Sequence, residues 1–289
     1  LFTGIIGIYI KKFLKKDYLF DLRDLWPDSA LALKQLSENL IFKLAKKLEY
    51  KIYESAKGFI FPVPGFRDYL LKLPKVTAQK PMFELINGVS SDFINHATSL
   101  KVNEDKKFTV LYSGNLGLAQ DLETTILAAK KLENYDIYFR FIGEVVCKKD
   151  IIHLSESLGV NKKVFFHNTM SRKELISWIK RASICIVPLK NRELFNNALP
   201  SKMFEYMACE KPIIAGVKGE VAKFVEKSKS GICVNPEDVS DLYKSILYFF
   251  NNEEKRKKHG KNGFRFINEN LIKEELILKL MQQIKDSFE

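Results

Sequence analysis

The sequence predicts an α/β protein whose main domain is a doubly wound parallel sheet. Six short apolar or β-branched runs after Phe108 are typical of buried parallel strands: FTVLYSG, IYFRFIG, KVFFHN, ASICIVPL, KPIIAG and GICVNP. Helical segments stand between them. Residues 120–133 repeat their apolar side chains at helical spacing, and SRKE at 171–174 has the form of a capping box. Strands that alternate with helices in this way favour a sheet with both faces covered.

The first hundred residues show the same alternation in a shorter piece. YLFDLRD, GFIFPVPG and FELINGV predict three strands, with a lysine-rich amphipathic helix over 37–56 between the first two. Residues 94–107 are polar, lack apolar periodicity and are predicted to be the boundary. We therefore expect an incomplete first domain over 1–95, a second domain over 106–262, and one long helix over 263–289 that packs back on the first domain.

The composition limits the class of partner. The 289 residues carry a formal net charge of +12, which suits an anionic partner or simply a surface rich in solvated lysine. No basic motif interleaved with aromatic residues is present, so nucleic acid is not expected. The four cysteines form no C-x-x-C pair and build no metal pattern with the four histidines. These features predict a reduced, cytoplasmic protein without a metal.

Two basic segments raise the question of a membrane. KKFLKK and the lysines of the 37–56 helix are suited to peripheral contact with anionic lipid at the inner face of the cell membrane. A solvated helix face explains the same lysines equally well. The apolar run LFTGIIGIYI before KKFLKK has ten residues, whereas a membrane-spanning helix needs about 20.

The stretch NNALPSKMFEYMACEKPIIAG places two charged residues in an apolar segment. Pro200 is predicted to be the first residue of a helix. The free N–H groups of that helix start and the Lys202 ammonium would together form an anion site, and Glu205 would accept hydrogen bonds from sugar hydroxyls. The alternative is that Lys202 and Glu205 form a surface ion pair worth about 0.2–0.5 kcal/mol.

A second loop points to the same chemistry. LYSGNLGLAQDLE, residues 111–123, predicts a strand, a turn with Gly114 and Gly117, and then a helix. Glycines let backbone N–H groups approach a phosphate closely, although Gly117 also suits an ordinary tight turn. No D-x-D, H-E-x-x-H or G-x-S-x-G motif is present. The negative charge of a phosphate would therefore be neutralised by Lys202 and helix ends, with no metal and no cofactor.

These motifs together resemble retaining glycosyltransferases of family four, which have the GT-B fold. The resemblance rests on LPSKMFEYMACEKPIIA, SICIVPL, LYSGNLGLAQDLE, DLRDLWPDS, INGVSSDF and GKNGFRFINENL. It is closest to the N-acetylfucosamine-type transferases of O-antigen and capsule assembly. It implies two doubly wound Rossmann-type domains, the first one incomplete here. Because members of the family have a longer amino-terminal part, we expect this sequence to be a fragment, a split gene product or a chain read from an internal start.

The resemblance also implies roles for particular residues. Glu205 matches the second glutamate of the family's E-x7-E motif, which holds the donor ribose, and Lys202 matches a lysine near the diphosphate. Asn197 stands where the first glutamate would be, so its contact with the sugar would be neutral. Glu210 replaces a glycine and, if left-handed, costs about 1 kcal/mol. The other donor-binding residues expected are Ser113, Gly114, Asn115, Gln120, Gly143, Asn168, Met170, Ser201, Gly219 and Glu220.

The implied activity is transfer of a sugar from a nucleotide sugar, expected to be UDP-linked, with retention of configuration. The acceptor would be a glycan or a polyprenyl-diphosphate-linked molecule in bacterial cell-surface polysaccharide synthesis. Two alternatives stay open. One is a degenerate or split donor-binding subunit without activity, which Asn197 favours. The other is a nucleotide-sugar 2-epimerase with the GT-B fold. Neither a covalent nucleophile nor a general base is assigned.

Overall fold

The computed structural model describes residues 1–73, 76, 79–144, 148–197 and 199–289. Its contacts divide the chain into two compact units, which we describe separately. Unit 1 comprises Leu1–Asn87 and Glu274–Glu289, and unit 2 comprises Gly88–Lys273. Among the helices of the described residues, none is both long and apolar enough to cross a membrane.

Unit 2 contains a six-stranded, wholly parallel sheet in the order β6-β5-β4-β7-β8-β9. The six strands predicted after Phe108 are confirmed: β4 (Phe108–Ser113), β5 (Ile137–Ile142), β6 (Val164–His167), β7 (Ile184–Pro188), β8 (Ile213–Gly216) and β9 (Gly231–Val234). The chain first winds outward through β5 and β6 and then returns to start β7 beside β4. The loops after β4 and β7 therefore diverge at a topological switch point, where open α/β sheets bind ligands.

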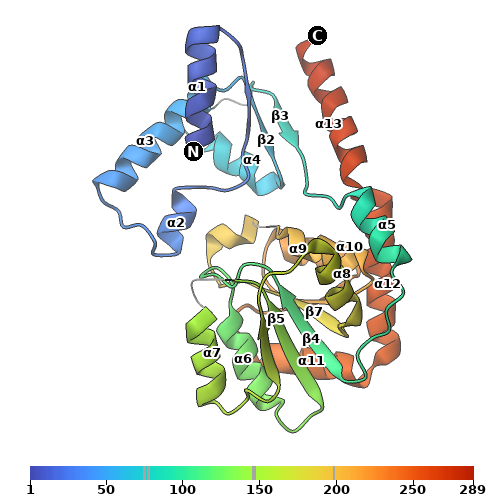
Figure 1. Ribbon diagram of the computed structural model, residues 1–289. Helices are drawn as coiled ribbons and strands as arrows, with labels where there is room; N and C mark the ends of the chain where they lie inside the picture. Colours follow the sequence, from blue (N-terminus) through green and yellow to red (C-terminus); the bar gives the residue numbers. More distant parts are fainter. Residues whose placement is uncertain (74–75, 77–78, 145–147, 198) are drawn as a thin grey trace. The chain divides into compact units, whose positions relative to one another are not determined.

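Helices cover both faces of this sheet (Figure 1). The α6 (Leu122–Lys131), α7 (Lys148–Ser157) and α11 (Val239–Asn251) helices form one layer, because α6 packs on both α7 and α11. The other layer contains α8 (Arg172–Arg181), α9 (Ser201–Ala208), α10 (Glu220–Ser228) and α12 (Glu253–Asn270). Right-handed crossovers place helices on opposite faces when the chain changes direction, as it does here.

Apolar side chains of the α6 and α11 layer pack on one face of the sheet. Phe139, Ile184 and Ile214 of the strands are at most 1% exposed, as are Ile126 of α6 and Phe249 of α11. Each such side chain contributes about 1.5–3 kcal/mol by leaving water. The rigid sheet edge that results holds the loops of the site.

Unit 1 contains a three-stranded parallel sheet of β1 (Leu19–Asp21), β2 (Gly58–Phe61) and β3 (Met82–Glu84), in the order β1-β2-β3. Its helices are α1 (Phe2–Leu14), α2 (Asp28–Ala32), α3 (Leu40–Ser55), α4 (Pro64–Leu71) and α13 (Lys273–Phe288). A fully buried carboxylate, Glu49 of α3, accepts a hydrogen bond from Tyr69 at 2.9 Å and pairs with Lys46. Partnered in this way, the charge is tolerated inside the unit.

Three local predictions are wrong. Residues 94–107 are not wholly a linker, because α5 (Ser91–Ser99) reaches into them and buries Ile94 and Ala97. Pro200 is not the first helical residue: its ψ of 123° is extended, and it precedes α9 as the N-cap. The single helix over 263–289 is broken, because Val89 donates to the Leu271 carbonyl at 2.9 Å and accepts from Lys273 N–H at 2.9 Å.

One other local prediction is confirmed, and one condition left open by the sequence is met. Ser171 and Glu174 form the predicted capping box at the start of α8. Glu210 has a φ of 57°, so this non-glycine residue does adopt the left-handed conformation between α9 and β8.

Candidate functional site

The carboxyl end of β4 is tied to α9 by buried hydroxyl groups. Ser113 N–H donates to the Tyr206 hydroxyl at 2.8 Å, and that hydroxyl donates to the Ser113 carbonyl at 3.2 Å. The neighbouring Tyr112 hydroxyl donates to the Asn115 carbonyl at 2.6 Å. These bonds fix the start of the loop after β4 and set the position of α9 against it.

Two glycines bring the loops after β4 and β5 together. Gly114 has a φ of 126° and Gly143 a φ of 147°, a region that side chains strongly disfavour. A Cβ at Gly143 would lie only 2.0 Å from the Gly114 carbonyl oxygen. Gly114 N–H donates to the Ile142 carbonyl at 2.9 Å, and Gly143 N–H donates to His167 at 3.1 Å. Both positions therefore require glycine for conformation, and Gly143 also requires it for space.

Lys202, in the first turn of α9, lies against the Gly114 loop that was predicted to approach a phosphate. Its Nζ donates a hydrogen bond to the Tyr112 hydroxyl and lies 3.9 Å from the centroid of that ring. The same Nζ is 3.1 Å from the position that a Cβ on Gly114 would occupy. Two motifs that lie far apart in the sequence are thus brought into contact.

The charges at this edge are perturbed by burial. Burial lowers the pKa of Lys202 to about 7, and Glu205 opposes this effect. Burial raises the pKa of Glu205, and the charges of Arg172 and Lys202 oppose that effect. Arg172 Nη2 lies 3.6 Å from Glu205 Oε1, whereas the described residues show no such ion pair between Lys202 and Glu205. The alternative of a surface pair between Lys202 and Glu205 is therefore wrong.

The start of α9 carries no side-chain cap within the described part of the chain. Ser201 is exposed there, and its N–H belongs to a first turn whose amides lack helical partners. The positive end of the helix dipole adds to the Lys202 charge. An electropositive corner results, at the carboxyl ends of β4 and β7.

A pocket of about 360 Å³ opens beside this corner. Its walls come from the loops after β4, β5 and β6 and from the start of α8. It is lined by Ser113, Gly114, Asn115, Ile142, Gly143, Glu144, Thr169, Met170 and Leu175. Five of the residues expected to bind the donor therefore line one cavity, and one of them, Gly114, lies beside Lys202.

The remaining expected residues lie around the pocket rather than in its lining. Gln120 accepts a hydrogen bond from Gly117 N–H at 3.1 Å and so holds the loop after β4. Asn168 is exposed in the loop between β6 and α8. Asn197 lies in the 3₁₀ helix η1 (Glu193–Asn197), which leads toward α9. Ser201 begins α9 itself.

The loop before α10 supports η1. Gly219 has a φ of 67°, and a Cβ there would lie 2.2 Å from the Asn196 carbonyl oxygen. Glu220, the next residue, pairs with Lys223 at 2.9 Å. The position of these two residues is therefore set by packing against η1 and by a pair within α10.

Sequence reasoning missed Tyr112, Tyr206 and Arg172. Tyr206 adjoins Glu205 and Tyr112 precedes the SG turn, so each lies next to a residue that was singled out. Arg172 was counted only as part of a capping box, yet its side chain pairs with Glu205 and its guanidinium carbon lies 5.1 Å from the Phe93 ring. The described residues contain no group of three His, Cys, Asp or Glu side chains suited to hold a metal.

The parallel α/β architecture, with a site at the carboxyl ends of the strands, is that of the GT-B glycosyltransferases. The solved structure of Anabaena HepE in complex with UDP and glucose has a TM-score of 0.78 with this chain. The match covers 98% of this chain and 75% of that one at 13% identity. It shows the fold.

The family follows from the sequence of unit 2. Residues 96–266 match the family model described as glycosyl transferases group 1, so the chain belongs to that family. An uncharacterised glycosyltransferase of Methanocaldococcus jannaschii is 30% identical over 138 residues, which are 47% of this chain and 37% of that protein. WcaI of Escherichia coli, named as a glycosyl transferase of colanic acid biosynthesis, is 27% identical over 145 residues, 49% of this chain and 35% of that protein. The matches thus span little more than a third of either relative.

Proposed function

We propose that this chain transfers a sugar from a UDP-linked donor to a glycan or lipid-diphosphate acceptor, with retention of configuration. The observation that carries the proposal is the contact of Lys202 with the Gly114 loop at the mouth of a pocket. A diphosphate placed there would receive the Lys202 ammonium, the free amides of α9 and the exposed backbone of Gly114. The UDP in the HepE structure supports this choice of nucleotide.

Glu205 and the pocket would bind the rest of the donor. The Glu205 carboxylate is one helical turn beyond Lys202 and partly buried, which suits hydrogen bonds from ribose hydroxyls. The pocket beside Gly143 and Met170 would hold the nucleobase, with Asn168 at its edge. Asn197 would face the sugar with a neutral amide.

The chemistry expected is electrostatic. Departure of the nucleotide leaves negative charge on its diphosphate, and positive groups fixed in place beforehand stabilise that charge most effectively. Lys202 and the N-terminus of α9 are held by Tyr112 and Tyr206 before any ligand arrives. This arrangement lowers the barrier without a metal and without a covalent intermediate on the protein.

The acceptor is proposed to belong to a cell-surface polysaccharide pathway. The resemblance to N-acetylfucosamine-type transferases of O-antigen and capsule assembly supports this, as does the colanic acid assignment in the name of WcaI. Such acceptors are carried on polyprenyl diphosphate at the inner face of the cell membrane, where a cytoplasmic enzyme would meet them.

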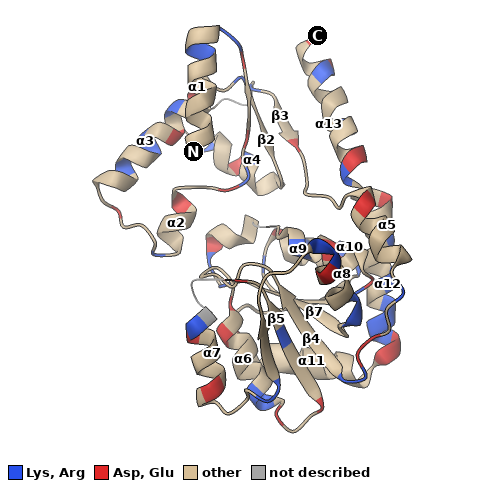
Figure 2. Cartoon of the chain, viewed as in Figure 1, with Lys and Arg blue, Asp and Glu red and all other residues tan. Residues whose placement is uncertain are grey.

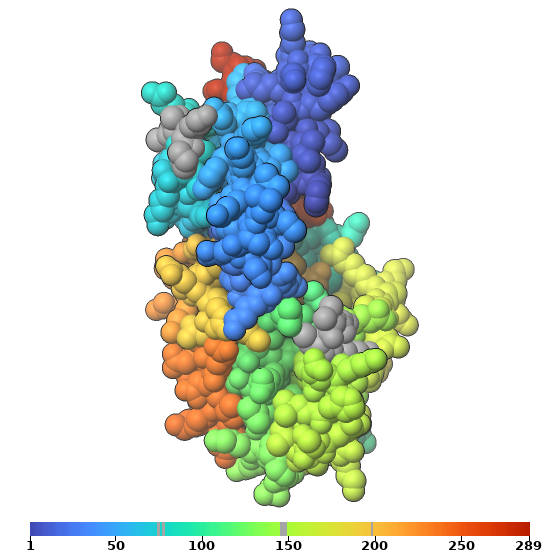
Figure 3. Space-filling model, turned by 90° about the vertical axis from the view of Figure 1, so that its left-hand side faces the viewer, coloured from blue at the N-terminus to red at the C-terminus, as the bar shows by residue number. Residues whose placement is uncertain are grey.

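Peripheral contact with an anionic membrane is proposed for α3. Its exposed side chains combine Leu40, Ile41 and Leu44 with Lys43 and Lys47. Figure 2 shows the basic residues along this helix, and in Figure 3 the helix lies at the surface facing the viewer. Apolar side chains that enter the lipid interface, next to lysines worth about 1 kcal/mol each on an anionic surface, fit a peripheral helix.

A vesicle flotation assay tests the membrane contact. The full chain should float with vesicles that contain phosphatidylglycerol and stay behind with pure phosphatidylcholine. Lys43→Glu with Lys47→Glu should abolish flotation, whereas Lys131→Glu with Lys255→Glu, exposed lysines of unit 2, should not. Equal flotation of both double variants would exclude α3 as the contact.

Calorimetric titration of the full chain tests the donor site. UDP, GDP and ADP are titrated into the wild type, Lys202→Ala and the control Lys131→Ala, whose lysine is exposed at the end of α6. We expect UDP to bind most tightly, and Lys202→Ala to lose at least tenfold in affinity while the control stays within twofold. Equal binding of UDP by all three proteins would exclude the site.

Product analysis separates the transferase from its alternatives. A transferase releases UDP only when an acceptor is present, a 2-epimerase isomerises the sugar and retains the UDP linkage, and a non-catalytic subunit does neither. A UDP-sugar of changed configuration with no free UDP would therefore identify the epimerase. Binding without any turnover in the presence of acceptor would identify the subunit.

A further inference from the structure

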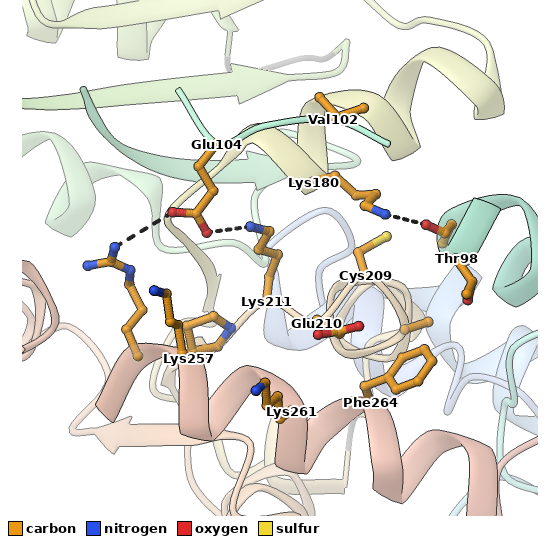
Figure 4. A pocket seen from close by; sticks show the side chains of 14 residues that line it. Thr98, Val102, Glu104, Lys180, Cys209, Glu210, Lys211, Lys257, Lys261 and Phe264 are labelled. Carbon is orange, nitrogen blue, oxygen red and sulfur yellow. Dashed lines mark hydrogen bonds and ion pairs between the residues drawn. The ribbon is translucent and has the colours of Figure 1, made fainter. Parts of the chain in front are cut away.

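A second pocket lies at the opposite edge of the sheet in unit 2, at the amino end of β8. Its volume is about 230 Å³. The left-handed junction between α9 and β8, the carboxyl end of α8 and one side of α12 form its walls (Figure 4). The lining residues are Ala97, Thr98, Val102, Glu104, Lys180, Ala208, Cys209, Glu210, Lys211, Pro212, Arg256, Lys257, Lys261 and Phe264.

The lining is dominated by positive charge. Five of its side chains are basic and two are acidic, Glu104 and Glu210. Figure 4 shows Lys257 and Lys261 along α12, across the pocket from Lys180. Basic groups that converge on one concave wall from three elements make a focused positive potential.

The floor holds two nearly buried cations that share one carboxylate. Lys211 Nζ lies 2.7 Å from Glu104 Oε1, and Arg256 Nη2 lies 3.6 Å from Glu104 Oε2. The Lys211 and Arg256 side chains are 8% and 11% exposed, whereas that of Glu104 is 41% exposed. One half-exposed carboxylate leaves one buried positive charge uncompensated, which an added anion would neutralise.

The side wall of the pocket also carries a positive charge, that of Lys180. Lys180 Nζ donates to the Ala97 and Leu100 carbonyls, so its contacts stabilise the ammonium without cancelling its charge. Burial raises the pKa of the Cys209 thiol to about 12, so this wall residue is neutral at physiological pH. No thiolate therefore opposes an incoming anion.

The rim offers cations that can close on a ligand. Lys261 is exposed and has no carboxylate within ion-pair distance among the described residues, and Lys257 is paired with Glu253 at 2.7 Å on the same helix. Both side chains are long and rotatable, and lysine binds phosphate as a point charge.

We propose that this pocket binds a small phosphorylated anion, either inorganic phosphate or an organic monophosphate. Its volume is below the roughly 300–1,000 Å³ of pockets for larger ligands, which favours a ligand smaller than a nucleotide. The site is distinct from the proposed donor site: Lys202 lies at the start of α9, and Cys209 follows its end. A ligand here would contact the carboxyl end of the helix whose other end carries Lys202.

Calorimetric titration with glycerol 3-phosphate tests the proposal, with glycerol as the uncharged probe and constant ionic strength. The full chain should bind glycerol 3-phosphate at millimolar concentration or tighter and should not bind glycerol. Lys257→Ala with Lys261→Ala should lose at least tenfold in affinity. The matched control, Lys255→Ala with Lys258→Ala, removes two exposed lysines of α12 that do not line the pocket, and should stay within twofold.

Inorganic phosphate as a second probe distinguishes the source of the ligand. Tighter binding of glycerol 3-phosphate indicates an organic monophosphate, and equal binding indicates that the phosphoryl group alone is recognised. The titration in Lys202→Ala separates the two sites, because binding at this pocket should survive that change. Loss of affinity in Lys202→Ala but not in the Lys257/Lys261 variant would overturn the proposal, as would a wild type that does not bind.

Discussion

The Nζ of Lys202 lies 3.9 Å from the centroid of the Tyr112 ring and donates a hydrogen bond to its hydroxyl. Burial raises the pKa of Tyr112, so this partner is a neutral phenol. The ammonium is therefore held by a ring face and a hydroxyl, which orient it without neutralising it. A cation kept in place in this way is oriented to receive an anionic ligand. Burial destabilises the Lys202 ammonium enough for its pKa to lie near neutrality.

The affinity for UDP should fall as the pH rises above neutrality. In the empty site burial lowers the pKa of Lys202 to about 7, and a bound diphosphate would raise it by favouring the ammonium. Binding then takes up a proton above pH 7, so the affinity decreases from pH 7 to pH 9, by about fiftyfold where the bound ammonium keeps its proton over that range. Calorimetry at constant ionic strength measures this, with Lys202→Met, which cannot titrate, as the control. A wild-type affinity that does not vary with pH would contradict the assignment.

Tyr206→Phe should both destabilise unit 2 and weaken UDP binding. The change removes the hydroxyl that accepts from Ser113 N–H and donates to the Ser113 carbonyl, and leaves both buried groups without that partner. The expected loss in the free energy of unfolding is about 1–3 kcal/mol. Urea denaturation measures it. Tyr248→Phe, which removes an exposed hydroxyl on α11, should change stability by less than about 0.5 kcal/mol. If both variants unfold alike, Tyr206 is not the anchor of α9.

The sequence allowed the sheet of unit 2 to be predicted well, for a physical reason. Strands covered by helices on both faces are apolar along their whole length, and this pattern is local. The proximity of Lys202 and Gly114 could also be predicted, because both follow parallel strands whose carboxyl ends lie at one edge of the sheet.

What the sequence did not reveal depends on long-range contacts. Tyr206 meets Ser113 across 93 residues, and no local pattern specifies that partner. The helix ends after α12 because Val89 forms backbone hydrogen bonds with Leu271 and Lys273. Val89 lies near the start of unit 2 in the sequence and Leu271 near its end. The α5 helix is nine residues long and buries only Phe93, Ile94 and Ala97, which is too little for periodicity to indicate.

Gly143→Ala should be far more damaging than the same change at Gly159. A Cβ at Gly143 would lie 2.0 Å from the Gly114 carbonyl oxygen, at a φ of 147°. Gly159 also has a positive φ, 71°, but a Cβ there meets nothing within 4 Å. We expect a loss of about 3 kcal/mol or more at Gly143 and about 1 kcal/mol at Gly159, measured by urea denaturation. Equal losses at the two positions would show that the loops after β4 and β5 do not approach this closely.

A double-mutant cycle between protein and ligand should show whether Glu205 binds the ribose. Removing a hydrogen bond to a charged acceptor costs about 1.5–3 kcal/mol, so Glu205→Ala should weaken UDP binding by tenfold or more. The same loss is expected when the wild type binds 2′-deoxy-UDP or 3′-deoxy-UDP, according to the hydroxyl that Glu205 contacts. For that deoxynucleotide Glu205→Ala should cost almost nothing further, because the two changes remove one bond. Arg172→Ala removes the ion-pair partner of Glu205 but no donor contact, so it should weaken only the ligands that keep the hydroxyl bound by Glu205. Fully additive losses for both deoxynucleotides would exclude Glu205 from the ribose and leave it as a partner of Arg172.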